Sequence, residues 1–304
     1  MITERFLQRT ARRRVRMSMA VLCATVLVGC GSDSPKEPAD VPPEIVSRPP
    51  VVAANFSAPT VIDNRFFPMP PGREYVLEGT ANRGGGQLPH QVLITVTDLT
   101  KVVDGVNTVV VWERDLNEGK LFETELAFFA QDDDGNLWNL GEYPEEYSEK
   151  GKFMGAPSTW ISGLSKAQGG IHVHGDPKPA TPSYLTGLAP NVDFLDGARV
   201  EALNRQACAR IGCFSDVLVI DEWNTTPGDG HQLKNYAPGV GLLRVDPRGG
   251  EEEESLVLSS VKMLDPTALA KVRAEALRLD KRGYEHGGKD YARTPPVAQP
   301  VAAG

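Results

Sequence analysis

Two histidines stand two residues apart in the segment Ile-His-Val-His-Gly-Asp, residues 171–176. Residues two apart in an extended strand point to the same side, so His172 and His174 could bind one metal ion, with Asp176 as a third ligand. Two imidazoles and a carboxylate suit zinc, copper or iron. The simpler interpretation is a surface loop, because three glycines flank the pair. We therefore expect no metal or other cofactor and keep the metal site as an alternative.

A second pair of metal-binding or redox residues is Cys208 and Cys213, which are separated by four residues. In an oxidising compartment this spacing permits a disulfide across a tight loop. Two free thiols are the simple alternative, and a zinc site shared with His172 and His174 is a third one that an oxidising compartment disfavours. The sequence therefore predicts a disulfide.

Carboxylates for acid–base chemistry are also available, at Glu123, Glu125, Glu142, Glu145 and Glu146. In an acidic chain such pairs arise by chance, and the run of glutamates at 251–254 is interpreted as solvated. The sequence holds no Gly-x-Ser-x-Gly motif, no phosphate-binding loop and no dinucleotide fingerprint. We therefore favour a function without catalysis.

The first thirty residues indicate export. Residues 1–16 carry six arginines and one glutamate, and residues 17–29 are almost wholly apolar. This is the pattern of a secretory signal peptide, and its apolar part is shorter than the about 20 residues that span a bilayer. The motif Leu-Val-Gly-Cys at 27–30 resembles the lipobox of bacterial lipoproteins. That resemblance implies cleavage before Cys30 and lipidation of its thiol, whereas the alternative is an ordinary signal peptide.

Lipidation would place the protein in the bacterial cell envelope, anchored to a membrane by acyl chains such as palmitate. Gly31 rather than aspartate follows the cysteine, which favours the outer membrane in a Gram-negative cell. Residues 1–29 carry a net charge of +5, so the formal charge of −8 for the whole chain becomes −13 after cleavage. Such an acidic chain with no basic stripe excludes nucleic acid as a partner. The partners expected are the membrane and a small molecule or a protein.

Strands dominate the middle of the chain. In the segment 90–115 apolar residues alternate on both sides of Asp104-Gly105, a hairpin turn, and a second turn follows at 117–120. Short strands between Gly and Asp turns predict a mainly β fold, an antiparallel meander that forms a sandwich or an open barrel. Residues 142–195 show no clear strands, which is where function often lies.

One helix is predicted after the strands. Asp265 can cap it, Pro266 suits its first turn, and Gly283 ends it. An apolar stripe of Leu269, Val272, Ala276 and Leu279 predicts that the helix packs on the sheet. The expected organisation is a signal peptide at 1–29, a lipidated cysteine and disordered tether at 30–52, a β-domain at 53–264, the helix at 265–283 and a disordered tail at 284–304.

Four sequence segments, taken together, resemble those of a known protein family: VIDNRFFPMPPGREYVLEG at 61–79, TDLTKVVDGVNTVVV at 97–111, FFAQDDDGNLWNLGE at 128–142 and NYAPGVGLLR at 235–244. They resemble a widespread group of bacterial secreted proteins and lipoproteins with no assigned activity. The resemblance implies one β-rich domain and lends no catalytic residues.

The function that the sequence favours is that of a membrane-anchored envelope lipoprotein that binds a small apolar ligand or a partner protein. A cavity lined by several of the aromatic residues would suit such a ligand. A metal-dependent enzyme that uses His172 and His174 is one alternative, and a purely structural envelope protein is another.

Overall fold

The computed structural model describes residues 43–82, 86–225, 230–250 and 253–299. Its strands are β1 (Arg73–Asn82), β2 (Gln87–Val103), β3 (Val106–Asn117), β4 (Lys120–Gln131), β5 (Leu137–Tyr147), β6 (Phe153–Gly155), β7 (Trp160–Ile161), β8 (Gln168–Val173), β9 (Tyr184–Ala189), β10 (Phe194–Ala209), β11 (Gly212–Asn224), β12 (His231–Ala237), β13 (Gly241–Arg248) and β14 (Glu254–Met263). Its helices are η1 (Ala53–Asn55), η2 (Pro190–Val192), α2 (Pro266–His286) and α3 (Gly288–Tyr291).

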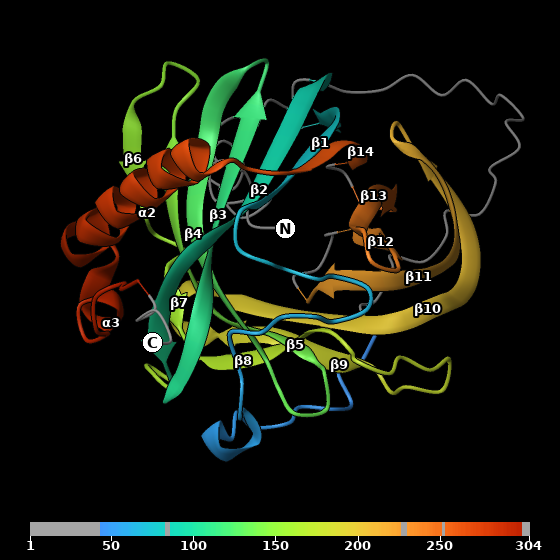
Figure 1. Cartoon of the computed structure of the whole chain (residues 1–304), viewed down its shortest axis with the longest axis horizontal. Helices are drawn as coiled ribbons and strands as arrows, with labels where there is room; N and C mark the ends of the chain where they lie inside the picture. Colours follow the sequence, from blue (N-terminus) through green and yellow to red (C-terminus); the bar gives the residue numbers. More distant parts are fainter. Residues whose placement is uncertain (1–42, 83–85, 226–229, 251–252, 300–304) are drawn as a thin grey trace, which may run out of the picture.

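The strands form one closed antiparallel barrel of twelve strands (Figure 1). Strands that follow one another in sequence are neighbours around most of the ring, and the ring closes where β1 pairs with β14. Strands β6 and β7 pair with β5 outside the ring. The prediction of a mainly β antiparallel fold is confirmed, with the barrel closed rather than open. Closure gives every strand of the ring two neighbours and so removes exposed edges.

The two predicted hairpin turns are present. Asp104 and Gly105 have φ angles of 51° and 78°, and Glu118 and Gly119 have φ angles of 51° and 74°. Two consecutive positive φ angles match the right-handed twist of the flanking strands. These turns fix the register of β2, β3 and β4 and thereby decide which side chains face the barrel interior.

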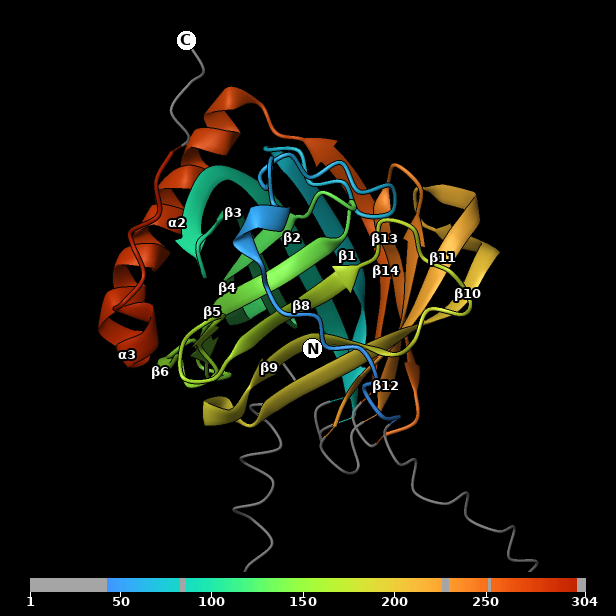
Figure 2. The ribbon, with the colours of Figure 1, turned by 90° about the horizontal axis from the view of Figure 1, so that it is seen from below.

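Helix α2 lies along the outside of the barrel, over β2 and β4 (Figures 1 and 2). Its N-terminus is capped as expected, because the Asp265 carboxylate accepts a hydrogen bond of 2.8 Å from the Ala268 amide. The helix runs to His286 rather than ending at Gly283. A Cβ atom at Gly283 would lie 2.3 Å from the Tyr291 ring, so this glycine permits a close approach instead of ending the helix.

Two segments that were expected to be disordered pack on the barrel. At the C-terminal end, the backbones of Ala298 and Thr100 exchange hydrogen bonds of 2.7 and 2.9 Å, and Val297 is buried. At the N-terminal end, Ser47 pairs with Tyr184, and Ile45 is buried. Each segment is held by backbone hydrogen bonds and a few isolated buried side chains, which give no periodic signal in the sequence.

The segment 142–195 contains strands after all, from the end of β5 to β9. Strands β6 and β7 are three and two residues long, and β8 has two glycines directly after its first residue, so none of them shows alternation. No helix in the described part of the chain is both long and apolar enough to cross a bilayer.

Candidate functional site

The barrel contains a partly open cavity of about 130 Å³. A volume of this size holds on the order of ten water molecules. Its wall is formed by side chains from β1 to β5, β8 and β12 to β14, together with Phe67 from the segment before β1. The barrel is therefore hollow and not filled by its own side chains.

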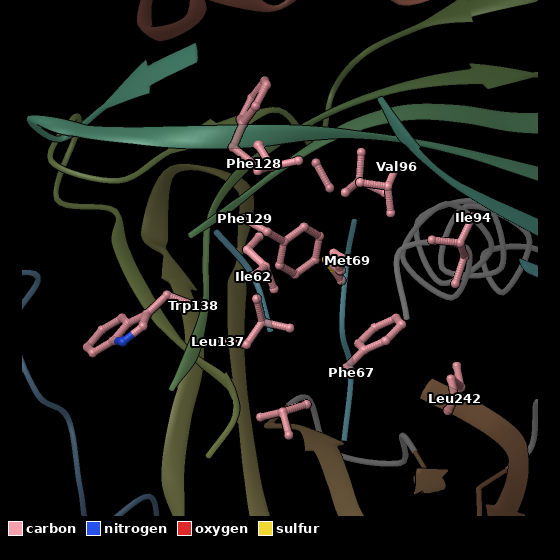
Figure 3. Close-up of a cluster of buried hydrophobic side chains, with 14 of the residues drawn as sticks. Ile62, Phe67, Met69, Ile94, Val96, Phe128, Phe129, Leu137, Trp138 and Leu242 are labelled. Atoms are coloured by element: carbon pink, nitrogen blue, oxygen red, sulfur yellow. The ribbon is translucent and has the colours of Figure 1, made fainter. Parts of the chain in front are cut away.

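One part of the cavity wall is apolar and aromatic. Phe67 lies with its ring centre 5.6 Å from Tyr75, 5.5 Å from Tyr236 and 6.0 Å from His172. Phe129 approaches from β4, with its ring 5.4 Å from His172. Figure 3 shows Phe67 and Phe129 pointing into the same space from different elements. This part of the wall can accept a hydrocarbon or aromatic group.

The chain from 56 to 72, which we call the end segment, brings Phe67 to this position and crosses the barrel in Figure 1. Asn64 fixes its shape: its side-chain oxygen accepts hydrogen bonds from the amides of Phe66 and Phe67, and its side-chain nitrogen donates to Gly135 across the turn between β4 and β5. The amide of Gly72 then donates to Val96 on β2 at 2.8 Å. The last residue of the end segment is thus attached to β2 beside Val96.

Farther from the end segment, the wall becomes acidic. Six carboxylates line the cavity: Glu113, Asp115, Glu123, Glu125, Glu142 and Glu254. Glu113 on β3 lies directly opposite Glu125 on β4, and the next inward-facing pair is Asp115 opposite Glu123. Like charges directly opposite one another in a sheet are destabilising. The imidazole of His90 lies between two of these acids, with Nδ1 3.2 Å from Asp115 and Nε2 3.4 Å from Glu254.

The electrostatics of the wall follow from this arrangement. Burial, and then the charge of Glu142, raise the pKa of Glu113 to about 7. No ion-pair partner of Glu113 lies within 4.0 Å among the described residues. Lys234 contacts Glu222 at 2.8 Å. Burial acts to raise the pKa of Glu222, but the charge of Lys234, its hydrogen bond and other nearby positive charge together hold that pKa below its usual range. The one lysine on the wall therefore already has an anionic partner.

Two other polar groups of the wall are notable. The side-chain nitrogen of Gln232, a residue that is 6% exposed, has no hydrogen-bond partner in the described part of the protein. Burial, and then the charge of Lys234, lower the pKa of His172 to about 4, so this imidazole is neutral near pH 7. Its Nε2 atom lies 3.4 Å from the hydroxyl of Tyr236.

The structure does not bring the three predicted metal ligands together. His172 faces the cavity, whereas His174 lies against the ring of Tyr184 at 4.4 Å and contacts Asn136. Asp176 is exposed and pairs with Lys178 at 3.0 Å. Among the residues that the structure describes, no three His, Cys, Asp or Glu side chains gather closely enough to hold a metal ion.

The two cysteines of the expected disulfide face each other at the tip of the β10–β11 hairpin. Cys208 and Cys213 are register partners, with Cα atoms 4.0 Å apart, and the structure joins them by a disulfide. The predicted lipidation site, Cys30, lies outside the described residues.

The carboxylates of the cavity are the residues whose importance sequence reasoning missed. Glu123, Glu125 and Glu142 stand out in the sequence only as candidates for chance pairs, and Glu254 only as part of a charged run. The sequence signal that could have identified them was the alternation of glutamates with apolar residues along β4. Polar side chains at every second position of a strand can face either solvent or a polar barrel interior.

Comparisons with known proteins add little to this site. No protein-family model matches the sequence, and no curated protein matches it. A structure from Bacteroides fragilis, provisionally described as an exported protein with a YmcC-like fold, is 13% identical with a TM-score of 0.39 and covers 66% of this chain and 99% of its own. A provisionally described lipoprotein from Parabacteroides distasonis is 14% identical with a TM-score of 0.31 and covers 66% of this chain and 100% of its own. TM-scores this low do not establish a shared fold and carry no function to this chain.

Proposed function

We propose that this protein is a lipid-anchored protein of the bacterial envelope whose barrel binds a small molecule with an apolar body. The observation that carries ligand binding is the hollow interior, with an aromatic wall formed by Phe67, Phe129 and Tyr236. A barrel with a purely structural role has no need of an internal cavity, whereas barrels of more than eight strands commonly hold ligands.

The anchor and the cavity would then act together. The signal peptide and Cys30 support attachment to a membrane, and an apolar wall behind a closed barrel supports shielding of a poorly soluble molecule from water. The anchor is tested by Cys30→Ser, which should abolish incorporation of labelled palmitate and release the protein from membranes. Equal labelling of this variant would contradict lipidation at Cys30.

Ligand binding is tested with the neutral, apolar fluorescent probe N-phenyl-1-naphthylamine and the soluble Cys30→Ser protein. The probe should bind with micromolar affinity and fluoresce on entering the cavity. Ala127 lies on the cavity wall and is buried, so Ala127→Phe should fill the space and weaken probe binding at least tenfold. Overpacking costs about 1–3 kcal/mol, so circular dichroism must show that the variant is folded.

The matched control is Val102→Phe, which adds a ring at an exposed position of β2. This variant should bind the probe as the parent protein does. If the folded Ala127→Phe protein binds the probe with unchanged affinity, the probe is not in the barrel and the proposal is wrong.

A further inference from the structure

We propose that the ligand of the barrel is a neutral amphiphile whose head group carries an oxygen acceptor, such as a carbonyl, that receives a hydrogen bond from the side-chain amide of Gln232. Its hydrocarbon part would lie against the aromatic wall. This inference rests on the proposed function and specifies the chemical class of the ligand.

The side chain of Gln232 is the first argument. It lines the cavity and is 6% exposed, and its Nε2 atom has no hydrogen-bond partner in the described part of the chain. An amide N–H can only donate, so an acceptor is the one kind of group that satisfies it. Because an unsatisfied buried donor is costly, a ligand gains free energy by bringing an acceptor here. A hydrocarbon and an ammonium group both lack one.

The position of Gln232 is the second argument. Gln232, Lys234 and Tyr236 occupy alternate positions of β12, and all three face the cavity. Gln232 and Tyr236 are thus about 13 Å apart at the rise of a strand. Tyr236 belongs to the aromatic wall, with its ring centre 5.5 Å from that of Phe67. An amphiphile that lies along β12 can therefore place its head group at Gln232 and its hydrocarbon part at the aromatic rings.

The titration of two wall residues indicates that the ligand is neutral. Burial, and then the charge of Glu142, raise the pKa of Glu113 to about 7, whereas burial, and then the charge of Lys234, lower that of His172 to about 4. An acid and a base are thus both shifted toward their uncharged forms, and burial is the main cause for each. A charged head group of either sign would meet the same desolvation cost.

The cations of the wall are already engaged. Lys234 contacts Glu222 at 2.8 Å, and Arg114 contacts Glu74 at 3.2 Å. A ligand carboxylate or phosphate would have to displace a glutamate from one of these ion pairs. An uncharged oxygen at Gln232 leaves both pairs intact.

The acids of the wall likewise have partners within the protein. Asp115 lies 3.2 Å from the imidazole of His90. Glu142 accepts hydrogen bonds of 2.6 and 2.7 Å from the side chains of Asn139 and Trp160. These carboxylates are stabilised by the fold itself, so they do not call for a cationic ligand.

The size of the cavity guides the choice of a test molecule. A volume of about 130 Å³ accommodates a molecule of roughly ten heavy atoms. The ketone 2-octanone is of this size and carries one carbonyl acceptor near the end of its chain. The alkene 2-methyl-1-octene has the same shape, with a CH₂ group in place of the oxygen, and offers no comparable acceptor.

The experiment compares these two molecules in the parent protein and in a variant without the donor. Each is titrated at pH 7 against the Cys30→Ser protein loaded with N-phenyl-1-naphthylamine, and displacement of the probe gives its affinity. Gln232→Met keeps the size of the side chain and removes its N–H groups. We expect this variant to bind 2-octanone about tenfold more weakly and 2-methyl-1-octene within twofold of the parent.

The control variant is Gln206→Met, which makes the same change at an exposed position of β10. It should bind both molecules as the parent does. A second measurement needs no comparison of affinities: the infrared carbonyl stretch of bound 2-octanone should lie at lower wavenumber in the parent than in Gln232→Met, because a hydrogen bond weakens the C=O bond.

Charge is tested in the parent protein with octylamine, which is protonated at pH 7 as a lysine side chain is. It should displace the probe at least tenfold less effectively than 2-octanone. Tighter binding of octylamine than of 2-octanone, or an equal effect of Gln232→Met on the ketone and the alkene, would overturn the assignment of a neutral acceptor while ligand binding itself stands. Failure of the probe to bind at all would instead overturn the proposed function.

Discussion

The ammonium nitrogen of Lys101 lies 2.9 Å from a carboxylate oxygen of Asp280, and the two side chains are 0% and 6% exposed. Lys101 belongs to β2 and Asp280 to α2, so this ion pair joins the barrel to its helix. Asp280 also accepts hydrogen bonds from the hydroxyl of Tyr291 and the amide of Val297. One buried carboxylate therefore connects the barrel, the helix and the C-terminal segment.

Removal of this carboxylate should be costly. Asp280→Ala leaves the buried ammonium group of Lys101 without its partner, and we expect the free energy of unfolding to fall by about 3–5 kcal/mol. Urea denaturation measures the change. The exposed pair of Glu275 and Arg278 is the control, since Glu275→Ala should change stability by less than about 1 kcal/mol. Equal effects of the two substitutions would contradict the structural role of Asp280.

The stability of the protein should depend on Glu113 above pH 4.5. Folding raises the pKa of Glu113 from 4.5 to about 7, so between these values the folded state holds a proton that the unfolded state has lost. The free energy of unfolding therefore falls as pH rises through this window. The Glu113→Gln variant lacks this loss. The difference in free energy of unfolding between variant and parent should therefore shift by about 2–3 kcal/mol in favour of the variant between pH 4.5 and pH 8. Parallel stability curves for the two proteins would refute the shifted pKa.

His172 should have the opposite pH dependence. Its pKa falls from 6.5 to about 4 on folding, so as pH drops through this window the unfolded state takes up the proton first. The contribution of the neutral imidazole is present above pH 6.5 and is lost toward pH 4. Between pH 7 and pH 4, the free energy of unfolding of the His172→Gln variant should therefore fall by about 2–3 kcal/mol less than that of the parent protein. Denaturation series at both pH values measure the difference, and an equal loss in both proteins would show that His172 titrates normally.

The hairpin disulfide makes a further prediction. Alkylation of the unreduced mature protein followed by mass spectrometry should leave both Cys208 and Cys213 unmodified. Because the bridge closes a short loop, its removal by Cys208→Ser, Cys213→Ser should lower the free energy of unfolding by only about 2 kcal/mol. Alkylation of both thiols without reductant would mean that the bridge is absent.

Strand β4 shows what the sequence could predict and what it could not. The alternation of Phe122, Leu126 and Phe128 with Glu123 and Glu125 was visible, and the structure places the two sets on opposite faces. The sequence did not show which of the two faces lines the barrel. Both faces of β4 are buried in the structure, so the usual rule that the apolar face points inward does not decide between them. The apolar face is covered from outside, where Phe128 lies 6.3 Å from the ring of Tyr291, and this leaves the glutamates inside.

The helix illustrates the same limit. Asp265 and Pro266 predicted its start correctly because capping depends on residues next to one another in sequence. Its end was misplaced at Gly283, because the reason for that glycine is the ring of Tyr291, eight positions farther along the chain. In the same way, the cavity depends on pairings around the whole ring, and no local pattern contains them.

The pairing of β1 with β14 has a consequence for how the chain folds. Nearly the whole described β-region separates these two strands in sequence, so their contact belongs to the slowest class of contacts to form. A chain emerging from its N-terminal end can build the β1–β4 meander early, but the ring stays open until its last strand arrives. Until then β1 presents a free edge, and the barrel interior acquires its binding properties only in the final step of folding.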